Sequence, residues 1–238
     1  ARDGYKNIFM GGASLYFADK GKFFAEHGYS ETYGKEEWSR SGVKHFSDWG
    51  LYDDDLFKRA RSKLDELEKA KSPFNLTLLT VDTHIPKGFV NQTCAQQGVT
   101  DYKGIMACTA GLVADFVTYM KQKGYLDNTV VVIMGDHLSM AAPLESELNK
   151  TRQKRSIYNA IITPVPLQKN SDTIYHFGMF PTILYALGFR FDQNRLGLGV
   201  SGFGELDPDF VIPTLDLDTF NELLAKTSRR YLEFWKAR

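Results

Sequence analysis

The sequence predicts an α/β protein with a largely parallel central sheet flanked by helices. Short apolar runs of strand length recur along the chain, amphipathic stretches of helical length separate them, and no internal repeat or low-complexity linker interrupts the alternation. With 238 residues, the chain is long enough to bury a sizeable core. We therefore expect one domain that extends over residues 1–238.

The first elements are a strand, a short helix and a long helix. Lys6–Met10 predicts a strand, and Phe23–Glu26 lies in a short helix. Asp53–Lys71 predicts a long helix, because three aspartates at its start suit the helix dipole. One apolar stripe runs along this helix, formed by Leu56, Ala60, Leu64 and Leu67.

The middle of the chain continues the alternation. Phe74–Val81 is a continuous apolar run, which is typical of a central parallel strand buried on both faces. Residues 83–103 form a long polar loop, and loops of this length in compact domains are often functional. A helix is expected from about residue 105 to residue 123. Thr129–Met134 is the most strand-like segment of the chain.

The C-terminal part predicts one more strand and two helices. Ser156–Thr163 is expected to be a strand, and Phe180–Leu187 a helix that Gly188 ends. Leu196–Glu205 is predicted to be a glycine-rich loop. Asp216–Ala237 is predicted to be one amphipathic helix, with Asp216 or Asp218 as its cap.

Composition excludes some classes of partner. The 29 basic and 29 acidic residues cancel, which argues against general attraction to nucleic acid. No apolar run reaches the roughly 18–20 residues that span a bilayer. The chain opens on Ala1-Arg2-Asp3-Gly4 without a signal-peptide pattern and enters an apolar run almost at once. We therefore expect a segment excised from a longer protein.

Two of the predicted strands end in polar residues that can bind metal ions. Thr129–Met134 is followed by Gly135, Asp136 and His137, and Phe74–Val81 by Asp82, Thr83 and His84. Ligands of open α/β sheets bind at the carboxyl ends of strands, where a carboxylate and an imidazole can reach Zn²⁺, Mn²⁺ or Mg²⁺. A structural role also fits each end, because an aspartate often caps the next helix and His84 can be an ordinary loop histidine.

Other candidate residues have a simpler structural interpretation. His176 precedes the predicted helix 180–187 and can pack at its N-terminus, and Trp49 is more typical of packing than of a substrate platform. Cys94 and Cys108 fit two free thiols or one disulfide about equally well. The chain lacks the phosphate-binding loop of nucleotide-dependent kinases, the dinucleotide fingerprint and the serine-hydrolase elbow, which argues against those classes.

The order of several motifs resembles the sulfatase/alkaline-phosphatase superfamily, and within it the phosphoglycerol transferase branch. That branch includes enzymes that modify periplasmic glucans and, more distantly, lipoteichoic acid synthases. The matching segments are Gly4-Tyr5-x-x-x-Phe9-Met10-Gly11-Gly12-Ala13, Phe17-Ala18-x-Lys20, His27-Gly28-Tyr29, Asp48-Trp49-Gly50-x-Tyr52-Asp53-Asp54, Thr80-Val81-Asp82-Thr83-His84-x-Pro86-x-Gly88-Phe89, Asp136-His137-Leu138-x-Met140 and Leu196-Gly197-Leu198-Gly199. The resemblance implies an alkaline-phosphatase-like sandwich that lacks its N-terminal part.

The resemblance also implies roles for individual residues. Asp136 and His137 match metal ligands for Mn²⁺, Mg²⁺ or Zn²⁺, and His84 matches the histidine that contacts the substrate phosphate. Phe17 falls where relatives carry an aromatic substrate contact, and Lys20 is a candidate phosphate or headgroup contact. His176 matches a histidine that some phosphoethanolamine transferases use near the metal. Cysteines at the positions of Cys94 and Cys108 in glucan-modifying relatives favour a disulfide.

The implied activity is transfer of a phosphoglycerol headgroup from a phospholipid to a glycan through a phosphothreonine intermediate. It implies a periplasmic or other extracytoplasmic location, as the soluble domain of an inner-membrane protein. The family's threonine nucleophile and first acidic metal ligand lie upstream of the matched segments, so we expect this chain to be incomplete as a catalyst. Phosphoethanolamine transfer, phosphodiester or sulfate ester hydrolysis, and an inactive binding domain are the alternatives.

Overall fold

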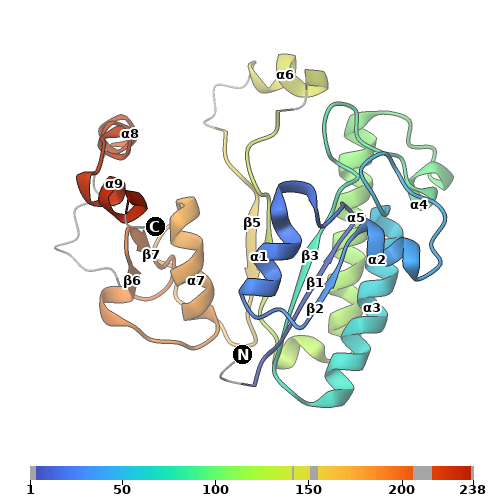
Figure 1. The fold of residues 1–238 in the computed structure, drawn as a ribbon, viewed down its shortest axis with the longest axis horizontal. Coiled ribbons are helices and arrows are strands. Elements are labelled where there is room, and N and C mark those ends of the chain that lie inside the picture. The colour runs from blue at the N-terminus through green and yellow to red at the C-terminus, as the bar shows by residue number, and fades with distance from the viewer. Residues whose placement is uncertain (1–3, 141, 151–154, 206–215, 237–238) are drawn as a thin grey trace. The chain divides into compact units, whose positions relative to one another are not determined.

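The computed structural model describes residues 4–140, 142–150, 155–205 and 216–236 (Figure 1). Their contacts divide the chain into two compact units, one drawn from residues 1–127 and 134–158 and the other from 128–133 and 159–238. A single domain over residues 1–238 stays a prediction. Within the described ranges, no helix has both the length and the apolar character needed to cross a membrane.

The first unit contains a parallel sheet and most of the helices. Its elements are β1 (Lys6–Gly11), η1 (Phe17–Asp19), α1 (Lys20–Glu26), β2 (Glu31–Tyr33), α2 (Lys35–Arg40), α3 (Asp53–Ala70), β3 (Phe74–Leu79), α4 (Gln92–Gln96), α5 (Tyr102–Gln122), η2 (Tyr125–Asp127) and α6 (Ala142–Leu148). The α/β class and the parallel sheet predicted from the alternating pattern are confirmed.

β1 is the central strand of the three-stranded sheet, whose order is β2-β1-β3. Lys6 pairs with Phe74 of β3 and Ile8 with Glu31 of β2, and both pairings are parallel. Ile8, Phe9 and Met10 of β1 are almost fully buried. The prediction that Phe74–Val81 is the central strand is wrong, because β3 has its described partner on one side only and stays partly exposed. An apolar run indicates burial, but it does not reveal how many neighbours a strand has.

Helices cover both faces of this sheet (Figure 1). Phe9 stacks on Phe24 of α1 with ring centroids 4.1 Å apart. Because successive side chains of a strand point to opposite faces, Ile8 and Met10 face the other helical layer. That layer contains α3, whose predicted apolar stripe is buried along its whole length, and α5, which packs on α3 through Phe57 and Phe116. The result is a helix–sheet–helix sandwich.

Several local predictions for this unit need correction. The polar segment 83–103 is not a plain loop, because it contains α4. α5 begins three residues before the predicted start, where the Asp101 side chain accepts a hydrogen bond from the Gly104 N–H and caps the helix. β2 and α2 were not predicted, since segments of three and six residues carry too little periodicity to be recognised.

The second unit is smaller. Its elements are β4 (Val131–Met134, of which the last residue counts with the first unit), β5 (Asn159–Ile162), η3 (His176–Gly178), α7 (Met179–Ala186), η4 (Asp192–Asn194), β6 (Arg195–Leu196), β7 (Gly199–Val200), α8 (Leu217–Ala225) and α9 (Arg229–Lys236). β4 and β5 pair with each other, and the strands predicted over 129–134 and 156–163 are confirmed. The helix predicted over 180–187 is also confirmed.

Two predictions for the second unit are wrong. The segment 196–205 is not all loop, because Arg195–Leu196 and Gly199–Val200 form a small antiparallel hairpin. The C-terminal segment is two helices rather than one, since Lys226 has extended backbone angles that end α8. The Asp216 cap is confirmed by its hydrogen bonds from the Asp218 and Thr219 N–H groups.

We predict that Gly50→Ala destabilises the protein. A Cβ atom on Gly50 would lie 1.8 Å from the backbone oxygen of Gly12, a clash that only backbone movement can relieve. We expect the free energy of unfolding to fall by about 3 kcal/mol, at the upper end of overpacking costs. Urea unfolding is the measurement, and Gly111→Ala is the control. Gly111 lies within α5 with no atom within 4 Å of the added carbon, so this change should leave stability equal or higher.

Candidate functional site

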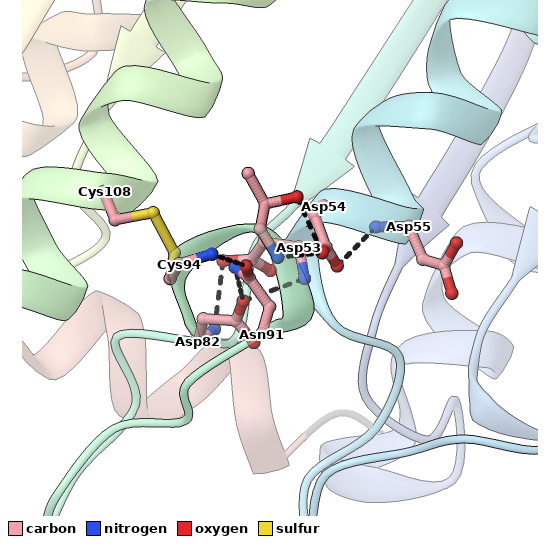
Figure 2. The surroundings of a disulfide bond; sticks show 8 residues. Asp53, Asp54, Asp55, Asp82, Asn91, Cys94 and Cys108 are labelled. Carbon is pink, nitrogen blue, oxygen red and sulfur yellow. Dashed lines mark hydrogen bonds between the residues drawn. A yellow bond between two sulfur atoms is a disulfide. The ribbon is translucent and has the colours of Figure 1, made fainter. Parts of the chain in front are cut away.

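Two buried aspartates join the start of α3 to the end of β3 (Figure 2). The Asp53 carboxylate accepts hydrogen bonds from the Val81 N–H at 2.7 Å and the Asp82 N–H at 3.0 Å. In return, the Asp82 carboxylate accepts from the Asp53 N–H at 3.0 Å. Both residues have no exposed surface. Each carboxylate therefore satisfies backbone donors of the other segment that would otherwise be buried without a partner.

These two carboxylates have raised pKa values. Burial raises the pKa of Asp53 from 3.8 to about 8, and the nearby Asp82 charge raises it further in the same direction. Burial also raises the pKa of Asp82, to about 6, against the hydrogen bonds that favour its charged form. The native protein thus binds more protons than the unfolded chain between about pH 4 and pH 8. Stability should fall as the pH rises through this range.

Asp82 is not available as a metal ligand, although its position at a strand end made it a candidate. Its Oδ2 atom accepts from the Asp53 N–H and from the Asn91 amide at 2.8 Å. Its Oδ1 atom has no hydrogen-bond partner within the part of the chain that the structure describes, but it is sealed from solvent. Asp82 therefore holds its surroundings in place instead of binding a ligand.

The loop that follows Asp82 is held at several points. The backbone oxygen of Asp82 accepts from the Phe89 N–H at 2.7 Å, and that of His84 accepts from the Gly88 N–H at 3.0 Å. The Tyr102 hydroxyl donates to the backbone oxygen of Thr83 at 2.7 Å. The Ile85–Pro86 peptide bond within this loop is cis. These bonds fix the position of the His84 side chain.

The disulfide predicted from the family resemblance is present between Cys94 and Cys108, and it ties α4 to α5. Asn91 links it to the aspartate pair, because its side-chain oxygen caps α4 by accepting from the Cys94 N–H while its amide donates to Asp82 (Figure 2). The disulfide therefore secures the residue that orients the Asp82 carboxylate.

Three of the predicted substrate contacts lie in one row of stacked groups. The His84 ring packs on Trp49 with centroids 3.8 Å apart, and Trp49 meets the Phe17 ring edge-on at 5.0 Å. The Lys20 ammonium lies 4.6 Å from the centre of the Phe17 ring and donates to the Phe17 backbone oxygen at 2.9 Å. We call Lys20, Phe17, Trp49 and His84 the aromatic row. Four groups from three separate segments thus form one polar and aromatic surface.

Trp49 is the member of the row that sequence reasoning assigned to packing. The sequence feature that could have identified it is its place in Asp48-Trp49-Gly50, because Gly50 has no room for a side chain. The Ser47 hydroxyl donates to the Gly50 oxygen at 3.0 Å and accepts from the Gly50 N–H at 3.1 Å, which closes a tight turn around Trp49. Trp49 is only partly buried, so the turn presents the ring instead of enclosing it.

The His84 ring has a defined proton arrangement. Its Nδ1 atom lies 2.8 Å from the backbone oxygen of Ile85. Because a carbonyl only accepts hydrogen bonds, Nδ1 carries the proton, and Nε2 holds the lone pair of the neutral ring. Nε2 can therefore take up a proton and then donate it to an anionic oxygen.

Burial also affects Lys20. It lowers the pKa of the Lys20 ammonium, and the Glu36 carboxylate opposes this effect. The amine is therefore only partly solvated where it lies over Phe17.

Asp136 and His137 form an exposed pair of donors after β4. The His137 Nε2 atom lies 3.5 Å from Asp136 Oδ2, and the side chains are 55% and 75% exposed. Nδ1 of His137 donates to the Leu138 oxygen at 2.8 Å, which leaves the Nε2 lone pair free for a cation. Asp136 also accepts from the His137 N–H, whereas α6 begins only at Ala142, so the predicted alternative of a helix cap is not what the structure forms.

Asp136 and His137 carry suitable ligand atoms for a divalent cation, but two residues are too few to form a complete site. A carboxylate oxygen and an imidazole nitrogen are ligands for Zn²⁺ or Mn²⁺, yet such sites take at least three protein groups. Among the described residues, no cluster of three or more histidine, cysteine, aspartate or glutamate side chains could hold a metal ion. Asp136 and His137 therefore fit as part of a metal site. The structure does not bring them into contact with His84.

His176 belongs to the second unit, whereas the other predicted site residues belong to the first. It is exposed at the first position of η3.

Comparison with known proteins gives a consistent result. The family described as Sulfatase matches residues 1–189. The chain is 35% identical to phosphoglycerol transferase I of Shigella flexneri over 208 residues, which are 83% of this chain and 27% of the relative. The chain thus spans about a quarter of the length of that relative.

Two solved structures share the fold. The lipoteichoic acid synthase LtaP from Listeria monocytogenes has a TM-score of 0.58 at 17% identity, over 79% of this chain and 51% of that one. A protein in the alkaline phosphatase superfamily from Vibrio parahaemolyticus has a TM-score of 0.52 at 20% identity, over 79% of this chain and 45% of that one. The alkaline-phosphatase-like fold class predicted from the sequence is confirmed.

We predict opposite outcomes for amide substitutions at the two buried aspartates. Both oxygens of Asp53 accept backbone N–H groups, so Asp53→Asn would turn an amide donor toward a donor. Asp82→Asn can keep its oxygen on the Asp53 N–H and place its amide at the unpartnered Oδ1 position. We expect Asp53→Asn to cost about 2 kcal/mol more of unfolding free energy at pH 7 than Asp82→Asn.

Urea unfolding of both variants between pH 5 and pH 8 is the measurement. Asp82→Asn should also flatten the fall in stability with rising pH, because one of the two repelling charges is gone. Equal stability of the two variants, or an unchanged pH dependence in Asp82→Asn, would contradict this interpretation of the pair.

We also predict that neither cysteine of the native protein reacts with a thiol reagent until it is reduced. The sulfurs are bonded to each other, and Cys94 has no exposed surface. After reduction, the free energy of unfolding should fall by about 3 kcal/mol, the typical contribution of a bond that closes a loop of this size. Mass spectrometry after labelling, with and without reductant, gives the number of labelled cysteines. One or two labels on the unreduced native protein would rule the bond out.

Proposed function

Because the chain belongs to the sulfatase family, we propose that it is the part of a metal-dependent transferase that binds the headgroup of a phospholipid donor. The group transferred is phosphoglycerol, and the acceptor is a glycan. The resemblance to phosphoglycerol transferase I supports the headgroup. The observation that carries the proposal is the aromatic row, which brings residues from three segments into one surface.

Each member of the row suits a different part of this headgroup. The Lys20 ammonium and a protonated His84 are donors for phosphoryl oxygens. The partly exposed rings of Phe17 and Trp49 offer apolar faces to the carbon atoms of glycerol. A rigid row of this kind holds the phosphorus in place for attack, which is a large part of the catalysis of phosphoryl transfer.

His84 is proposed to act on charge and protons during transfer. With its Nδ1 proton held by the Ile85 oxygen, the ring has Nε2 left for the substrate. In its protonated form it stabilises the negative charge that builds on the phosphoryl group, or gives its proton to the departing diacylglycerol oxygen. The headgroup is then carried by a threonine hydroxyl and passes to a hydroxyl of the glycan. We assign that role to no threonine among these 238 residues.

Asp136 and His137 are proposed to hold the metal together with further ligands. When bound, a divalent cation (Mn²⁺, Mg²⁺ or Zn²⁺) would neutralise phosphoryl charge and lower the pKa of the attacking hydroxyl. The pairing of His137 Nδ1 with the Leu138 oxygen supports the assignment, because it presets the ring for binding through Nε2. The proposed location is the periplasm or another extracytoplasmic space, at the membrane surface where the donor lipid lies.

Phosphoethanolamine transfer on the same scaffold is less well supported. An ethanolamine headgroup carries an ammonium ion, which the Lys20 ammonium at the end of the row would repel.

We predict that His84→Ala lowers headgroup transfer by about 100-fold or more, the usual contribution of a positioned acid or base. The assay measures transfer of labelled glycerol phosphate from phosphatidylglycerol to an oligosaccharide by the natural protein that carries this segment. Asp136→Ala should reduce transfer to background and release the bound metal. His27→Ala is the control, since this exposed histidine caps α1 away from the row and should leave transfer unchanged. Near-normal transfer by His84→Ala, or no transfer by the unaltered protein, would overturn the proposal.

A further inference from the structure

A cleft in the first unit is not used by the proposed headgroup site. Its volume is about 430 Å³, within the range of about 300–1,000 Å³ that ligand pockets occupy. Its walls come mainly from two turns, residues 46–52 and 87–90. The first turn carries Trp49 of the aromatic row, and the second turn follows His84 in the sequence. The two turns thus connect the cleft to the aromatic row along the chain, although no member of the row lines the cleft.

The first wall is rigid. The turn around Ser47 and Gly50 is closed by three hydrogen bonds, and the Leu51 N–H donates to the Gly12 oxygen at 3.0 Å. The Lys35 ammonium lies 5.9 Å from the centre of the Phe46 ring and donates to the Asp48 backbone oxygen at 3.4 Å. Phe46 and Asp48 are therefore held at the cleft without a ligand to order them.

The second wall is equally constrained. Phe89 is tied by its N–H to the Asp82 oxygen, and Gly88 by its N–H to the His84 oxygen. A side chain on Gly88 would clash with the Asp82 oxygen at 2.9 Å, so the wall follows the buried aspartate closely. The cleft is therefore formed before any ligand binds, which lowers the entropic cost of binding.

The lining combines aromatic rings with two opposite charges. Phe46, Tyr52 and Phe89 contribute rings, and Asp48 and Lys87 contribute a carboxylate and an ammonium. Across the part of the chain that the structure describes, neither charged group forms a hydrogen bond or an ion pair, and both residues are exposed. Because the two charges cancel, the cleft favours a neutral ligand over an anion or a cation. Rings beside free polar groups suit a ligand with apolar faces and many hydroxyl groups.

We propose that this cleft is the acceptor subsite and binds a neutral oligosaccharide. The inference rests on the proposed function, in which a sugar hydroxyl receives the headgroup. Pyranose rings stack on Phe46 and Tyr52, while Asp48 accepts hydrogen bonds from sugar hydroxyls and Lys87 donates to them. The turn that carries Trp49 and the turn that follows His84 also line the acceptor subsite, so the chain itself connects the acceptor subsite to the headgroup site.

The test measures two ligands separately on the natural protein that carries this segment. The acceptor probe is a β-linked glucose tetrasaccharide, and the donor probe is sn-glycerol 1-phosphate with Mn²⁺ present; both are titrated by NMR. Phe46→Ala should weaken tetrasaccharide binding by about tenfold, which corresponds to the loss of one aromatic contact. Asp48→Asn should weaken it as well, whereas Phe46→Tyr keeps the ring and should restore it. Phe189→Ala is the matched control, because Phe189 is an exposed phenylalanine in the second unit.

The outcomes separate this proposal from the proposed function. Tetrasaccharide binding that Phe46→Ala and Asp48→Asn weaken and Phe189→Ala does not would support the subsite. Failure of the tetrasaccharide to bind the unaltered chain, or equal binding by all variants, would overturn it. Glycerol phosphate binding that is lost in Trp49→Ala would still support the headgroup site in that case. A circular dichroism spectrum of each variant checks that binding was not lost through unfolding.

Discussion

The reciprocal hydrogen bonding between Asp53 and Asp82 is the constraint on which the rest of the first unit depends. Each carboxylate accepts backbone N–H groups from the segment that carries the other, deep in the protein where water cannot substitute. Bringing two carboxylates together without solvent is unfavourable, and their raised pKa values express that cost. The fold tolerates it because the backbone donors of two segments would otherwise be left unsatisfied.

The consequences extend outward from this pair to the surface. Asp82 fixes the chain just before His84, and its backbone oxygen also accepts a hydrogen bond from the Phe89 N–H. One residue therefore helps to position both His84 of the aromatic row and Phe89 of the cleft. Asn91 connects the same carboxylate to the disulfide between α4 and α5. Rigid surroundings of this kind are what a binding surface made of loops needs, since loops on their own do not hold side chains accurately.

The chemistry of the chain is divided between two places. The aromatic row combines residues of η1 and α1 with the turns before α3 and after β3, which also line the cleft. Asp136 and His137 instead follow β4 as an exposed pair. His84 and His137 are oriented in the same way. Each directs its Nδ1 proton to the backbone oxygen of the next residue, which leaves Nε2 free. An imidazole whose Nδ1 proton is held by the backbone has its Nε2 atom set in advance for a cation or an anionic oxygen.

The sequence by itself determined the α/β class, the long helix at Asp53 with its apolar stripe, and the polar strand ends that carry His84 and His137. These features follow from local periodicity and from residue type, which a single chain displays. Only the tertiary structure decided that β1 is central and that Asp82 serves the backbone instead of a ligand. It also decided that Trp49 lies between Phe17 and His84. These features depend on contacts between segments that are distant in the chain. The spacing of residues within one strand or helix does not reveal such contacts.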